Sequence, residues 1–135
     1  MANKKILVVD DDRQLLELVT LRLTAHGFEV ITAADGQEAL EKARRDKPDV
    51  IILDLMLPTL NGYEVCTMLK QDTKYQEIPI IMCTVKTEGK GEQLAFACGA
   101  DAYVRKPFQA DMADMLLEKI QAILTASQTP GEARP

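Results

Sequence analysis

The chain has 135 residues and a formal net charge of −5 at pH 7, and its 47% hydrophobic content fits one soluble domain with an aliphatic core. A pI near 4.9 argues against direct nucleic-acid binding by this domain. No apolar run approaches the about 20 residues of a membrane span and no signal segment is visible, so we expect a cytoplasmic protein without membrane association.

Short apolar segments alternate with amphipathic segments along the whole chain. Strands are predicted at residues 6–9, 30–33, 50–53, 79–83 and 102–104. Helices are predicted from Asp12 to His26 with Gly27 as the residue after the cap, and at 36–45, 63–72, 91–98 and about 109–125. Five strands alternating with five helices predict an α/β three-layer sandwich with a five-stranded parallel sheet.

The segment around residues 50–53 is the clearest of the predicted strands. Four consecutive apolar residues, three of them β-branched, indicate a strand buried on both faces, and Asp54 follows where the chain leaves the sheet. Further along, Asn61-Gly62 is typical of a turn.

The three cysteines are odd in number, widely spaced and set among apolar residues. Cys66, Cys83 and Cys98 are therefore expected to be buried thiols in a reducing compartment. The alternative is a redox or metal-binding role for these side chains.

Chemically active side chains follow several of the predicted strands. Because the carboxyl ends of parallel strands meet at one edge, where ligands of open α/β sheets bind, we expect these residues to converge. They are Asp10, Asp11, Asp54, Thr84 and Lys106.

Three carboxylates at one place repel one another and require a cation. An oxygen-only donor set without histidine or cysteine favours Mg²⁺. With an ammonium from Lys106 and a hydroxyl from Thr84, the set suits phosphoryl transfer onto Asp54 and formation of an acyl phosphate.

Each of these residues also has a simpler interpretation. Asp12 is expected to be the N-cap of the first helix, and Asp10, Asp11 or Asp54 alone would be a charged turn. Thr84 alone would be a strand residue and Lys106 a solvated one. The functional hypothesis therefore depends on their convergence at one sheet edge.

Several motifs, from about residue 4 to 124, resemble the receiver domain of two-component response regulators, of the single-domain chemotaxis type. They are Val8-Val9-Asp10-Asp11, Leu53-Asp54 with Pro58 and Gly62, Cys83-Thr84, and residues 99–108, which read GADAYVRKPF. The resemblance implies a flavodoxin-like sheet with strand order 2-1-3-4-5. Residues 1–125 would form the receiver domain, and 126–135 a flexible C-terminal tail or a truncated linker.

By this resemblance, Asp54 is the phosphoacceptor of a signalling switch and takes a phosphoryl group from a sensor histidine kinase or a phosphotransfer protein. Asp11, Asp54 and the backbone carbonyl of Met56 would bind Mg²⁺, with Asp10 acting mostly through water. Lys106 would contact the phosphoryl group.

The resemblance also implies how the signal leaves the site. Thr84 and Tyr103 would move together and remodel the face made by the fourth helix, fifth strand and fifth helix. That face would control a downstream protein target, and the resemblance also allows for a homodimer through it. Such a domain is not an enzyme beyond its own phosphorylation and dephosphorylation.

Three positions near the site depart from the family pattern or tune its chemistry. Val85 follows Thr84 where the family has a small residue, and Met56 and Lys86 occupy positions that set how fast the acyl phosphate hydrolyses. Apolar Met56 and β-branched Val85 would hinder an attacking water, so we predict a long-lived phosphoaspartate. Lys86 could instead act on partner choice.

Other functions fit the residues less well. An aspartate-nucleophile phosphatase needs a second acid two residues after the nucleophile, and Met56 stands there. A nucleotide-binding module needs a glycine-rich turn after the first strand, where this chain has acids. The remaining alternative is the N-terminal receiver of a longer regulator with an output domain.

Overall fold

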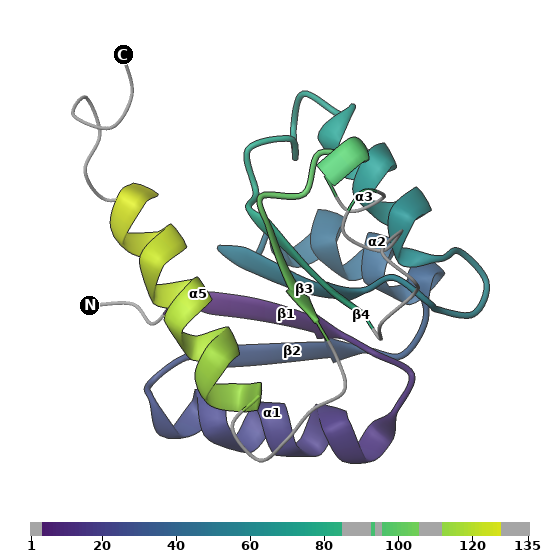
Figure 1. Cartoon of the computed structure of the whole chain (residues 1–135). Coiled ribbons are helices and arrows are strands. Elements are labelled where there is room, and N and C mark those ends of the chain that lie inside the picture. The colour runs from purple at the N-terminus through teal and green to yellow at the C-terminus, as the bar shows by residue number, and fades with distance from the viewer. Residues whose placement is uncertain (1–3, 85–92, 94–95, 106–111, 128–135) are drawn as a thin grey trace.

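The computed structural model describes residues 4–84, 93, 96–105 and 112–127 (Figure 1). In chain order its elements are β1 (Lys5–Val9), α1 (Arg13–Ala25), β2 (Glu29–Ala33), α2 (Gly36–Asp46), β3 (Val50–Asp54), α3 (Gly62–Lys70), β4 (Ile80–Thr84), β5 (Ala102–Arg105) and α5 (Met112–Ser127).

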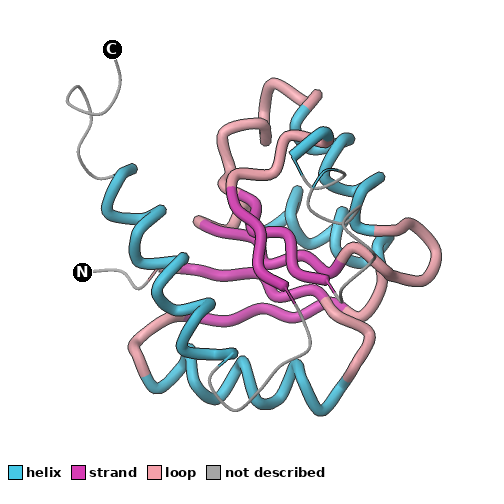
Figure 2. The backbone as a smooth tube through the Cα atoms, viewed as in Figure 1, coloured by secondary structure: helices cyan, strands magenta, loops and turns pink. Residues whose placement is uncertain are grey.

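The five strands form one parallel sheet in the order β2-β1-β3-β4-β5, which confirms the predicted topology. Helices α1 and α5 cover one face of the sheet, and α2 and α3 cover the other (Figure 1). The strands lie between these two helical layers (Figure 2), so the fold is the three-layer α/β sandwich expected from the sequence.

Alternate residues of each central strand enter two separate hydrophobic clusters. Leu7, Val9, Ile51 and Leu53 pack in the cluster that includes buried residues of α2 and α3. Ile6, Val8, Val50 and Ile52 pack in the cluster that includes buried residues of α1 and α5. Because side chains alternate between faces of a strand, a sheet covered on both faces requires continuous apolar runs such as residues 50–53.

The first helix begins and ends as the sequence predicts. Asp12 is its N-cap and accepts hydrogen bonds from the backbone N–H groups of Gln14 and Leu15. After the C-cap His26, Gly27 has a φ of +90°, a conformation that glycine adopts without a steric penalty.

The prediction of a turn at Asn61-Gly62 is wrong, because these residues begin α3. Asn61 is the N-cap of α3, and its side chain and that of Glu64 form a reciprocal capping box. Gly62 is the first helical residue, so this dipeptide starts a helix because its asparagine oxygen satisfies a free helical N–H.

The predicted helix at residues 91–98 lies mostly outside the described residues, although Gln93, Phe96 and Ala97 are helical. Residues 109–111 of the last predicted helix and the tail from 128 onward also lie outside them. Among the described residues, no helix is both long and apolar enough to cross a membrane.

Candidate functional site

Two buried aspartates lie side by side at the carboxyl edge of the sheet. Val9 of β1 pairs with Leu53 of β3, so Asp10 and Asp54, the residues that follow them in the sequence, lie side by side at the ends of neighbouring strands. Each has only 5% of its surface exposed, whereas Asp11 is exposed. Buried carboxylates are uncommon unless they have partners, so this pair marks a functional region of the fold.

Asp10, Asp11 and Asp54 bring their carboxylate oxygens together, as the strand-end pattern predicts. One oxygen from each lies within 4.8 Å of the others. At such distances like charges repel one another strongly, and a cation among them would remove the repulsion. The donor set consists of carboxylate oxygens, which suits a hard divalent ion such as Mg²⁺.

Backbone N–H groups orient the two buried carboxylates. The N–H of Asp12 donates to Asp10 Oδ1 at 2.9 Å, and the N–H of Met56 donates to Asp54 Oδ1 at 3.2 Å. Both donors lie two residues beyond the aspartate, in the loop that follows each strand. The loops therefore hold the carboxylates at the sheet edge.

The start of α3 packs directly against the end of β3. The Gly62 N–H donates to the Leu55 carbonyl at 2.8 Å, and a Cβ at Gly62 would lie 2.1 Å from the Asp54 carbonyl oxygen. Only glycine permits this approach, so Gly62 helps to position Asp54. Gly62 was predicted to lie in a turn, and its position soon after Asp54 in the sequence was the available signal for this contact.

The remaining predicted residues are only partly covered by the structure. Thr84 ends β4, and its neighbour Cys83 pairs with Asp54, so the Thr84 backbone reaches the same sheet edge. Tyr103 on β5 is partly buried against the α2/α3 cluster, and the Met56 side chain is 60% exposed. Val85, Lys86 and Lys106 lie outside the described residues.

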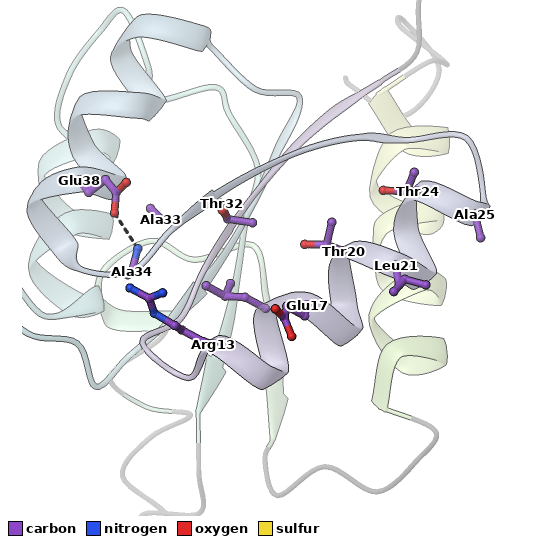
Figure 3. Close-up of a pocket in the computed structure, with 11 residues that line it drawn as sticks. Arg13, Glu17, Thr20, Leu21, Thr24, Ala25, Thr32, Ala33, Ala34 and Glu38 are labelled. Atoms are coloured by element: carbon purple, nitrogen blue, oxygen red, sulfur yellow. Dashed lines mark hydrogen bonds between the residues drawn. The ribbon is translucent and has the colours of Figure 1, made fainter.

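A groove runs along α1 beside β2, which is one of the two edge strands of the sheet (Figure 3). Its lining includes Arg13, Thr20, Thr32 and Glu38, but none of the three clustered aspartates. The Ala34 N–H donates to Glu38 Oε1 at 2.8 Å and, together with Lys42, holds the Glu38 pKa below its usual value.

A comparison with known protein families assigns the chain. The model of the response regulator receiver domain matches residues 6–121. The chain belongs to the response regulator receiver domain family. This finding confirms the resemblance seen in the sequence, and the clustered carboxylates occupy the carboxyl edge at which such an α/β sheet binds ligands.

Curated relatives of this receiver domain are longer regulators. The alkaline phosphatase synthesis transcriptional regulatory protein PhoP of Bacillus subtilis is 45% identical over 126 residues, which are 93% of this chain and 50% of that protein. The DNA-binding response regulator MtrA of Mycobacterium tuberculosis H37Rv is 43% identical over 106 residues, 78% of this chain and 45% of that protein. The chain thus spans about half the length of these relatives.

Solved structures of similar receivers match nearly end to end. The chemotaxis response regulator CheY4 of Vibrio cholerae has a TM-score of 0.81 and 36% identity, with 90% of this chain and 99% of that chain covered. A CheY-like receiver domain protein from Methanospirillum hungatei JF-1 has a TM-score of 0.86 and 30% identity, with 96% and 100% covered.

Proposed function

We propose that this receiver domain is a phosphorylation-dependent signalling switch in which Asp54 accepts the phosphoryl group. The observation that carries the proposal is the clustering of Asp54 with Asp10 and Asp11 within 4.8 Å. A nucleophilic carboxylate beside a cation site at the carboxyl edge of a parallel sheet is the arrangement that phosphoryl transfer to an acid requires.

Each of the three aspartates has a separate task in this mechanism. Asp11 is exposed and Asp54 buried, and both would hold Mg²⁺ with the backbone carbonyl of Met56, while Asp10 would act mostly through water. Bound Mg²⁺ would neutralise negative charge that develops on the transferred phosphoryl oxygens. The Met56 N–H keeps Asp54 Oδ1 in place, so that its carboxylate faces the donor in one orientation.

The transfer itself moves one phosphoryl group between two nucleophiles. An Asp54 oxygen forms a bond to phosphorus while the bond between phosphorus and the imidazole nitrogen of the donor breaks. The donor is a phosphorylated histidine of a sensor kinase or phosphotransfer protein, and the product is an acyl phosphate. Lys106 would contact the phosphoryl oxygens.

We infer that Thr84 and Tyr103 transmit the new charge. The phosphoryl group carries about two negative charges, which favour the state in which the Thr84 hydroxyl approaches it. Tyr103 would then turn inward and change the face that includes β5 and α5. That face would contact the downstream protein target or a second copy of the domain.

The lifetime of the phosphorylated state would depend on Met56, Val85 and Lys86. Met56 is 60% exposed next to Asp54, where an apolar side chain would obstruct the approach of water to the acyl phosphate. We expect the purified phosphoprotein with Mg²⁺ to persist well beyond seconds. Loss of the phosphoryl group within seconds would contradict this expectation.

The output of the whole protein is a separate proposal. MtrA is named as a DNA-binding response regulator, and the chain spans 45% of it. In a longer protein of that kind, the domain at residues 1–125 would regulate an output domain through the tail at 126–135. As a single-domain regulator it would act by protein contacts alone, and in either case we place it in the cytoplasm.

The test is phosphorylation by a small phosphodonor with Mg²⁺, read by intact mass. Wild type should gain one phosphoryl group and Asp54→Asn none. Asp12→Asn is the matched control, because it keeps an N-cap residue of equal quality next to the cluster. A wild type without the adduct, or an equal adduct on Asp54→Asn, would reject the proposed function.

A further inference from the structure

Two cysteines far apart in the sequence meet beneath α3. Cys66 lies on α3 and Cys98 lies just before Gly99, 32 residues later in the chain. The Cys66 thiol donates to the Cys98 carbonyl oxygen at 3.4 Å. Both side chains belong to the α2/α3 cluster, with 0% and 6% of their surfaces exposed.

The two thiols also interact with each other, and they differ in acidity. A hydrogen bond from the Cys66 thiol, with another from the Ala100 N–H, lowers the pKa of Cys98 to about 7. The same contact, together with burial, raises the pKa of Cys66. Cys98 is therefore the more readily ionised thiol of the pair.

The surrounding contacts hold these two segments together. Lys70, at the end of α3, donates to Asp101 Oδ2 at 2.9 Å and to the Ile78 carbonyl at 2.9 Å. Its aliphatic carbons also lie over Gly99, where an added Cβ would come within 3.1 Å of Lys70 Cγ. These contacts tie the end of α3 to residues 99–101 and so help to fix Cys98 relative to Cys66.

We propose that Cys66 and Cys98 form an intramolecular disulfide when the protein meets a peroxide. The Cys98 sulfur attacks a peroxide oxygen, the O–O bond breaks, and the departing hydroxide is protonated to water, leaving a sulfenic acid. The Cys66 sulfur then attacks the Cys98 sulfur, the S–O bond breaks, and the hydroxide leaves as water with the Cys66 proton. Two thiols and hydrogen peroxide thereby give one disulfide and two water molecules.

The bond would join α3 to the segment that leads directly into β5. Residues 98–101 precede Ala102, the first residue of β5, and Tyr103 follows it. A covalent link there would restrain any movement of this segment relative to α3. Neither cysteine belongs to the carboxylate cluster, so formation of the bond does not require phosphorylation of Asp54.

Cys83 provides a control within the same chain. It is also a buried cysteine, on β4, but it packs in the α1/α5 cluster on the opposite face of the sheet. The three cysteines fall in three different tryptic peptides, at residues 46–70, 75–86 and 91–105. Peptide mapping therefore distinguishes all possible pairings.

The experiment treats the reduced full chain with hydrogen peroxide, blocks remaining thiols under denaturing conditions, and measures intact and tryptic masses. We expect a monomer lighter by two hydrogens, a cross-linked peptide pair 46–70 and 91–105, and Cys83 alkylated. Reductant should reverse the change. The rate of disulfide formation should rise from pH 6 to pH 8, because Cys98, with a pKa of about 7, ionises in this range.

Variants separate this proposal from the phosphoacceptor proposal. Cys83→Ala and Asp54→Asn should both form the bridge as wild type does, and Cys66→Ala and Cys98→Ala should not. Wild type that keeps all three thiols, gains only oxygen on Cys98, pairs Cys83, or cross-links only between molecules would overturn the proposal. These wild-type readings stand even if a cysteine variant fails to fold.

Discussion

The two edges of the sheet use aspartate in opposite ways. At the amino edge, Asp49 precedes β3 and accepts the backbone N–H of Lys5 at 2.7 Å. Asp101 precedes β5 and accepts the backbone N–H of Ile80 at 2.8 Å. At the carboxyl edge, Asp10, Asp11 and Asp54 instead crowd within 4.8 Å of one another.

The direction of the strands explains this difference. A parallel sheet presents free N–H groups where its strands begin and free carbonyl groups where they end. A carboxylate at the amino edge therefore finds donors and stabilises the fold. At the carboxyl edge a carboxylate meets carbonyl groups and other carboxylates, and N–H groups of its own loop donate to it.

The largest effect on stability should come from the amino edge. Asp101→Ala removes the acceptor of the Ile80 N–H and the partner of Lys70, whose side chain is only 16% exposed. We expect a loss of about 2 kcal/mol in the free energy of unfolding, measured by urea denaturation. Asp11→Ala at the carboxyl edge is the control, and an equal loss in that variant would remove the contrast between the edges.

Mg²⁺ should act only on the carboxyl edge. At a concentration ten times its dissociation constant, it should stabilise the wild type by about 1.4 kcal/mol, because it binds the folded state. Asp11→Asn should lose this gain and, without metal, unfold at slightly higher urea because one repulsive charge is gone. Asp101→Asn should keep the full gain, and a loss of the metal effect there would place the cation elsewhere.

The smallest effect concerns Glu38, an acid in the first turn of α2 near the carboxyl edge. Its pKa is lowered by the Ala34 N–H and by Lys42. Because the pKa of Glu38 is lower in the folded state, its carboxylate stabilises the fold at pH values above the ordinary pKa of 4.5. This stabilisation is lost as the pH falls through the pKa of the folded state. Glu38→Gln should therefore weaken the fall in urea midpoint between about pH 5 and pH 3.

The control for Glu38→Gln is Glu41→Gln, at an exposed position of the same helix. The effect of Glu38→Gln should be modest, because its side chain is 39% exposed and solvent weakens the ion pair with Lys42. If the urea midpoints of the two variants fall equally as the pH is lowered, the contacts of Glu38 with Ala34 and Lys42 do not matter for stability.

Much of the site was predictable because Asp10, Asp11 and Asp54 stand at the carboxyl ends of two apolar strands. Asp10 and Asp54 could be placed at one edge from strand direction alone, and Asp12 could be separated from them as an N-cap. The strand order required the family resemblance, since periodicity does not say which strands are neighbours. Asn61-Gly62 was misjudged because the same dipeptide suits a turn and a capped helix start.

The sequence by itself determined the strands, most of the helices, the parallel α/β class and the acids at the strand ends, because these depend on local periodicity and chain direction. Only the tertiary structure decided that Gly62 lies against Asp54, that Lys70 holds Asp101, and that Cys66 meets Cys98. These last two contacts join residues more than 30 positions apart. They depend on how α3 packs on the sheet, which no local pattern specifies.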